Sequence, residues 1–244
     1  MNLIAKRIVR SLSGGSSQPL LVETQRGRFV VKLVHGPEGP RALAAEWIVS
    51  GIALAIGLPV AESAIIEVEP ELARSIEHQE LREAAARGAG ISFGARELVG
   101  AKLARTEEID KADDDFAMRL LWLDTLVENP DRTAKNPNIL SWGASLVPID
   151  HGAALPFHHR WRVTEASPSA ELEPTLDHVY ASRRVKLAAW HDRLAALVSR
   201  ETLRGICASV PDVWLGPIVF ATPARQRSAY AAYLWKRMRA LRRA

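Results

Sequence analysis

Apolar and polar positions alternate along the first third of the chain in the manner of short strands. Residues 41–56 differ, because they are Ala-rich and apolar on a broad face, and we expect a helix there. Pro40 can begin this helix, while Gly57 and Pro59 can end it. The predicted strands are residues 3–10, 20–23, 28–34, 64–68 and 95–99, and a more polar helix is predicted over 70–87.

The rest of the chain has mainly helical periodicity. Residues 110–127 form the strongest predicted helix, with Phe116, Leu120, Leu123 and Val127 spaced by three or four positions. The other predicted elements are a polar loop at 128–138, a hairpin made of 139–140 and 145–149, a long loop at 156–174, and helices at 185–198, 200–210 and 222–243. This order predicts a two-lobed α+β fold, with a small antiparallel-sheet lobe over about 1–100 and a helical lobe over 101–244.

Composition excludes several classes of protein. The 244 residues are 48% hydrophobic and carry a net charge of +4, which excludes a largely disordered chain. Cys207 is the only cysteine, so an intramolecular disulfide framework and a zinc site built mainly from cysteine are excluded. No segment reaches the roughly 20 apolar residues that span a bilayer, and the N-terminus does not resemble a secretory signal. We expect a cytoplasmic protein.

Charge is distributed unevenly near the end of the chain. Residues 225–243 contain seven basic side chains and no acid, which would suit nucleic acid or anionic lipid. A solvated helix face is the favoured interpretation of such a run. Nucleic acid is therefore not expected as a partner.

A Gly/Ser-rich turn between the first two strands is the first candidate for chemistry. Gly14 and Gly15 allow the backbone to approach a phosphate, and the turn continues with Ser16 and Ser17. A hairpin turn without a ligand is the alternative interpretation.

Two charged residues lie in apolar surroundings shortly afterwards. Lys32 lies within the apolar stretch 29–34 and needs an anion to offset its desolvation. Glu46, within the predicted helix 41–56, is the natural partner. The alternative is that both side chains extend to solvent.

Two polar motifs follow the strongest helix. Asp131 and Asn136 have the spacing D-x-x-x-x-N, at which kinase catalytic loops place a carboxylate for the acceptor hydroxyl and an amide for magnesium. Asp150 ends the predicted hairpin and Gly152 follows, which is where a kinase places its metal-binding aspartate. Taken alone, the D-x-x-x-x-N spacing favours a turn whose Asn and Asp side chains cap backbone groups, and the alternative for Asp150 is an acid in a turn.

Taken together, these features occur in the order that phosphoryl transfer requires, and the sequence resembles the HipA-like kinases, an atypical protein-kinase-like and phosphoinositide-kinase-like group. The most specific resemblance lies in NPDRTAKNPN at 129–138 and IDHG at 149–152. It implies ATP and Mg²⁺ as cofactors. Lys32 would hold the phosphates and pair with Glu46, Asp131 would orient a hydroxyl of a protein or small molecule, and Asn136 and Asp150 would bind magnesium.

Several positions depart from typical protein kinases. The turn at 13–17 is not G-x-G-x-x-G, Asn-Pro precedes Asp131, and His151 stands where typical kinases have phenylalanine. Two other function classes stay open: a nucleotide-binding pseudokinase scaffold, and a nucleic-acid-associated protein that uses the basic C-terminal helix. A metal cluster of His151, His158 and His159 is a further alternative, although these residues lack helical spacing.

Overall fold

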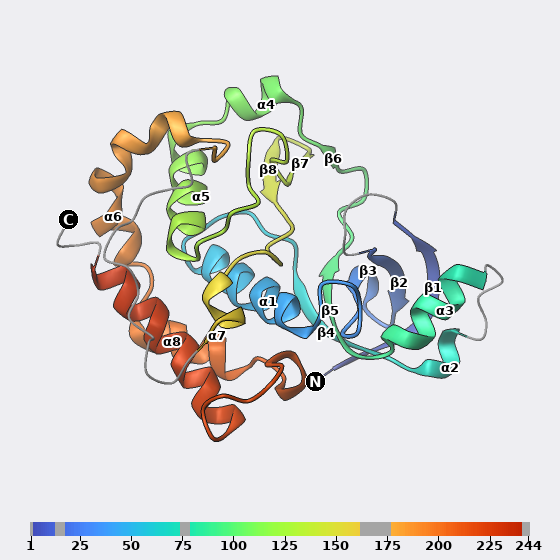
Figure 1. The fold of residues 1–244 in the computed structure, drawn as a ribbon. Helices are drawn as coiled ribbons and strands as arrows, with labels where there is room; N and C mark the ends of the chain where they lie inside the picture. The colour runs from blue at the N-terminus through green and yellow to red at the C-terminus, as the bar shows by residue number, and fades with distance from the viewer. Residues whose placement is uncertain (1, 13–17, 74–78, 162–176, 241–244) are drawn as a thin grey trace.

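The N-terminal strands close into a five-stranded barrel (Figure 1). The computed structural model describes residues 2–12, 18–73, 79–161 and 177–240. The barrel strands are β1 (Leu3–Ser11), β2 (Leu20–Thr24), β3 (Gly27–Lys32), β4 (Ser63–Val68) and β5 (Gly90–Arg96). Their order around the barrel is β1-β2-β3-β5-β4. Buried apolar side chains such as Val22, Phe29 and Ile66 fill the interior.

The sequence pattern predicted an antiparallel sheet, but the strands form a closed barrel that includes one parallel pair. β1 pairs in parallel with β4, with Leu3 opposite Ile66, and this pairing joins the two edges of the sheet. The other four pairings are antiparallel. Closure removes the exposed edges that an open sheet would leave.

The last barrel strand begins earlier than the sequence pattern suggested. We expected residues 95–99 to form a short strand, but β5 spans Gly90–Arg96 and pairs with both β3 and β4. Packing explains the glycine at position 94, since a Cβ atom there would collide with Cδ1 of Ile66. A glycine that weakened the strand pattern is therefore needed for close packing inside the barrel.

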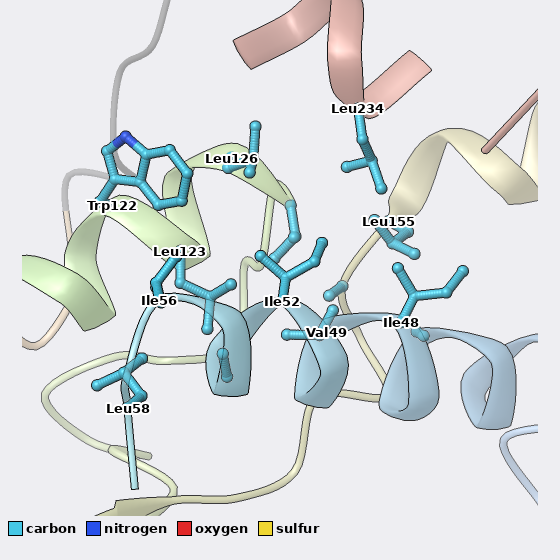
Figure 2. Close-up of a cluster of buried hydrophobic side chains, with 14 of the residues drawn as sticks. Ile48, Val49, Ile52, Ile56, Leu58, Trp122, Leu123, Leu126, Leu155 and Leu234 are labelled. Atoms are coloured by element: carbon cyan, nitrogen blue, oxygen red, sulfur yellow. The ribbon is translucent and has the colours of Figure 1, made fainter. Parts of the chain in front are cut away.

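Helix α1 (Pro40–Ala55) connects the barrel to the helical part of the molecule. It begins with proline at its first turn and is buried on nearly all sides. Ile48, Val49 and Ile52 pack with Leu123 and Leu126 in the cluster that Figure 2 shows. The helix that carries Glu46 is thus held within the main core.

The helical part gathers on the side of α1 away from the barrel (Figure 1). Its elements are α4 (Thr106–Asp110), α5 (Asp114–Leu126), η1 (Pro156–His159), η2 (Ala181–Lys186), α6 (Leu187–Ala195), α7 (Arg200–Ala208), η3 (Asp212–Trp214) and α8 (Pro223–Ala240). The expected helix 110–127 begins at Asp114, because the Asp113 carboxylate caps it by accepting a hydrogen bond from Phe116 N at 2.8 Å. Within the described residues, no helix is both long and apolar enough to cross a membrane.

Smaller elements complete the fold. Helices α2 (Pro70–Ala73) and α3 (Gln79–Gly88) lie beside the barrel, in the region expected as one helix over 70–87. The strands β6 (Lys102–Leu103), β7 (Ile139–Trp142) and β8 (Ser145–Pro148) form a second sheet. The hairpin of β7 and β8 confirms the predicted pairing of those segments, and Asp150 follows it.

Substitution of two leucines of α1 tests how much burial in the main core contributes to the free energy of unfolding. Leu43 is 1% exposed and Leu54 is 68% exposed. We expect Leu43→Ala to lower the free energy of unfolding by about 2–5 kcal/mol, because it leaves a cavity. The matched control Leu54→Ala should change it by less than about 0.5 kcal/mol. Urea unfolding of both variants measures the difference, and equal losses would contradict the assigned burial.

Candidate active site

Lys32 lies at the centre of a cluster of carboxylates contributed by separate elements. Its Nζ atom is 2.6 Å from Oε1 of Glu46 on α1 and 2.6 Å from Oδ1 of Asp150 after β8. A third carboxylate, Glu38, lies 3.4 Å away in the loop before α1. The cluster therefore joins the end of β3, the helix α1 and the β7–β8 hairpin at one point.

The ionised state of this cluster follows from its charges. Burial opposes the charge of Lys32, but Glu46, Asp150 and Glu38 outweigh it and hold the pKa of the ammonium above its ordinary value. Burial likewise favours the neutral form of Asp150, yet the Lys32 ammonium holds the pKa of that carboxyl below its usual value. Both groups are thus charged at neutral pH.

The backbone around Asp150 is shaped for close approach. Asp150 has φ of 58°, a left-handed conformation that is uncommon for residues with a side chain and that occurs often at functional sites. A Cβ atom on Gly152 would lie 3.0 Å from Oε2 of Glu38 and 3.4 Å from Nζ of Lys32. Glycine at this position therefore leaves the space that the charged cluster occupies.

The loop after α5 places Asp131 among amide side chains. Its Oδ2 atom accepts hydrogen bonds from Nδ2 of Asn136 at 3.0 Å and from Nδ2 of Asn138 at 3.1 Å. Its backbone N–H donates to Oδ1 of Asn129 at 3.1 Å. Asn136 thus contacts Asp131 across the loop, as the D-x-x-x-x-N spacing allows.

A buried ion pair beneath this loop was not found by the sequence analysis. Nε of Arg132 donates to Oδ2 of Asp124 at 2.6 Å, and both side chains are almost wholly buried. The same Asp124 oxygen lies 3.1 Å from Nε2 of His178, whose Nδ1 accepts a hydrogen bond from Tyr180 N. The available signal was Asp124 itself, an acid within an otherwise apolar stretch of helix that requires a buried partner.

His151 belongs to this buried network and not to a metal cluster. Its Nδ1 atom lies 3.0 Å from Nη2 of Arg132, which makes Nδ1 the acceptor. Burial and the positive charge of Arg132 lower the pKa of His151 to about 3. Within the described residues, no group of three or more His, Cys, Asp or Glu side chains is placed to hold a metal ion.

Two further predictions concern the phosphate-binding turn and the basic C-terminal helix. The expected phosphate-binding turn lies outside the described residues; its members are Gly14, Gly15, Ser16 and Ser17. In the basic C-terminal helix, Arg237 is buried and donates to the carbonyls of Leu126 and Thr125, so it stabilises the fold.

The family model for HipA-like kinases matches residues 5–227. The chain belongs to the HipA-like kinase family. The expected family resemblance is therefore confirmed, and it covers both the barrel and most of the helical part of this HipA-like kinase.

A solved structure has a similar fold. The Helicobacter pylori proinflammatory kinase CtkA matches with a TM-score of 0.58 at 14% sequence identity, over 96% of this chain and 93% of that chain. At this identity the similarity concerns the fold alone. No match was found among curated proteins.

His158 gives the fold a pH dependence in the acidic range. Its ring contacts the Tyr230 hydroxyl and His159, and burial followed by the charges of His159 and Arg41 lowers its pKa to about 3. The unfolded chain binds this proton near pH 6.5, so stability is full above that pH and falls as the pH drops toward 3. We expect this group to contribute about 1.4 kcal/mol per pH unit within that window.

Urea unfolding between pH 7 and 4.5 measures this contribution. His158→Gln should unfold with a shallower dependence on pH, whereas His35→Gln, at an exposed position, should keep the slope of the unmodified chain. Identical slopes for all three proteins would show that His158 is not buried as a neutral group.

Proposed function

We propose that this HipA-like kinase is an ATP- and Mg²⁺-dependent phosphotransferase that moves the γ-phosphate to a hydroxyl acceptor, with protein serine or threonine as the first candidate. The observation that carries the proposal is the position of Lys32, within 2.6 Å of both Glu46 and Asp150. Three separate elements supply the cation, its partner and a carboxylate suited to a metal. Phosphoryl transfer depends mainly on positioning and on charge stabilisation of this kind.

Lys32 is proposed to bind the phosphates of ATP. Its ammonium is fixed by Glu46 from a helix that is itself buried, so it can face an anion without losing its orientation. Its pKa is held above the ordinary value, which keeps the positive charge throughout the physiological range. We infer that residues 1–100 form the nucleotide-binding lobe and 101–244 the helical lobe, with Gly14, Gly15, Ser16 and Ser17 covering the phosphates.

Asp150 and Asn136 are proposed to hold Mg²⁺. The ionised Asp150 carboxylate and the amide oxygen of Asn136 are hard oxygen donors, which suit this cation. The amide nitrogen of Asn136 already donates to Asp131, so its oxygen is the atom left to bind metal. Bound magnesium would neutralise charge on the phosphates.

Asp131 is proposed to orient the acceptor hydroxyl and accept its proton. Both amide contacts to the carboxylate go to Oδ2, and the other oxygen, Oδ1, is the one proposed to face the acceptor. The loop that carries Asp131 is anchored directly after α5, a rigid buried helix. The alternative of a catalytically silent scaffold is weakened by the presence of all four polar residues, Lys32, Asp131, Asn136 and Asp150.

Substitution of Asp131 separates a chemical role from a structural one. We expect Asp131→Asn to lower the rate of γ-phosphate transfer by about a hundred- to ten-thousand-fold, with little change in ATP affinity, since it removes the proton acceptor and keeps the size. Asp110→Asn, an exposed change of the same kind, is the control.

The assay follows label from [γ-³²P]ATP and release of ADP, with the chain itself and general protein substrates as acceptors, in Mg²⁺ and in EDTA. A wild-type protein that releases no ADP and transfers no label would contradict the proposed function. A fully active Asp131→Asn variant would remove Asp131 from it.

A further inference from the structure

We propose that Arg132 is a positioning residue for phosphoryl transfer, whose guanidinium fixes the loop carrying Asp131 against the segment carrying Asp150. This inference rests on the proposed function, because it assigns the relative placement of the two acidic groups to a third side chain. Arg132 is 1% exposed, so its side chain is not available to contact a reacting group. Its effect would therefore pass through the residues that it holds.

The contacts of one guanidinium nitrogen span both segments. Nη1 of Arg132 donates to the carbonyl oxygens of Pro137 at 3.2 Å and Asn138 at 2.7 Å, which end the Asp131 loop. It also lies 3.2 Å from the carbonyl oxygen of Ile149, the residue before Asp150. The Arg132 side chain thus contacts the backbone of both segments, at the end of the Asp131 loop and directly before Asp150.

The ion pair with Asp124 reaches Asp131 by a second route. One oxygen of Asp124 accepts from Nε of Arg132, and the other accepts from Nδ2 of Asn129 at 2.9 Å. The Oδ1 atom of Asn129 in turn accepts from the backbone N–H of Asp131. The carboxylate that neutralises Arg132 therefore also fixes the start of the loop that carries Asp131.

The remaining guanidinium nitrogen holds the residue after Asp150. Nη2 of Arg132 donates to Nδ1 of His151 at 3.0 Å. Together with Ile149, this contact brackets Asp150, whose left-handed φ of 58° needs support from its surroundings. The planar guanidinium of arginine donates hydrogen bonds from three nitrogens in different directions, whereas the ammonium of lysine is a single charged group on a flexible stem.

Comparison of two buried arginines tests the proposal. Arg132→Lys keeps the positive charge that pairs with Asp124 and removes the planar guanidinium, whose three nitrogens make the contacts described above. Arg237→Lys is the matched control, because Arg237 is also buried and also donates to two backbone carbonyls. Its partners are Thr125, Leu126 and Glu128, at and just after the end of α5, and it contacts neither residues 133–138 nor 149–152 in these pairings. We expect both variants to lose similar melting temperature, and Arg132→Lys alone to transfer γ-phosphate at least tenfold more slowly at an unchanged dissociation constant for a fluorescent ATP analogue.

Hydrogen exchange gives a readout that does not depend on activity. In Arg132→Lys we expect amides of residues 133–138 and 149–152 to exchange at least tenfold faster than in Arg237→Lys. If Arg132→Lys fails to fold, the pair Asp124→Asn with Arg132→Gln removes both charges and should show the same faster exchange.

The outcomes separate the two proposals. Protection of both segments equal to that of the control, or transfer within tenfold of the control, would overturn the positioning role of Arg132. An inactive wild-type protein would instead overturn the proposed function, and the exchange measurement would still decide the role of Arg132.

Discussion

The ammonium of Lys32 is the point at which three parts of this molecule meet. A lysine at the end of an apolar strand loses much of its hydration, and it is tolerated only where anions replace the lost water. Here Glu46 and Asp150 each approach to 2.6 Å, one from α1 and the other from the β7–β8 hairpin. The barrel, the buried helix and the hairpin are thereby fixed relative to one another by one charge, and that charge is the one proposed to bind phosphate.

Helix α1 makes this arrangement rigid. It packs on α5 through the core of Figure 2 and on α7, where a Cβ atom on Gly51 would lie 2.9 Å from Ile206. Nε1 of Trp47, the residue after Glu46, donates to the Ser209 hydroxyl at 2.8 Å. The orientation of Glu46 toward Lys32 therefore depends on the helical part of the molecule as well as on the barrel.

The sequence predicted the parts of the site that obey local rules. Lys32 lies within an apolar strand pattern and Glu46 lies on an apolar helix, so the local pattern alone indicated that each charge needs a partner. Barrel closure was missed because the parallel pairing of β1 with β4 joins residues about sixty positions apart. Glu38 was missed for a similar reason, since its place beside Lys32 depends on the path of a Gly/Pro-rich loop.

The buried network under the loop that carries Asp131 shows the same limit. Arg132 lies within the motif at 129–138, yet its partners Asp124 and His151 come from the preceding helix and from the segment after the hairpin. A sequence motif fixes the spacing of residues along the loop but not the packing that holds the loop in place. Family membership, by contrast, was predictable because the spacing of the acidic and amide residues is local.

A crystal structure with Mg²⁺ and a non-hydrolysable ATP analogue tests the central claim most directly. The proposed site predicts that Nζ of Lys32 contacts phosphate and keeps Glu46 as its partner, while Asp150 and Asn136 bind a metal ion next to the phosphates. A nucleotide bound elsewhere, or bound here with Asp150 still paired to Lys32 and no metal on Asp150 or Asn136, would contradict it.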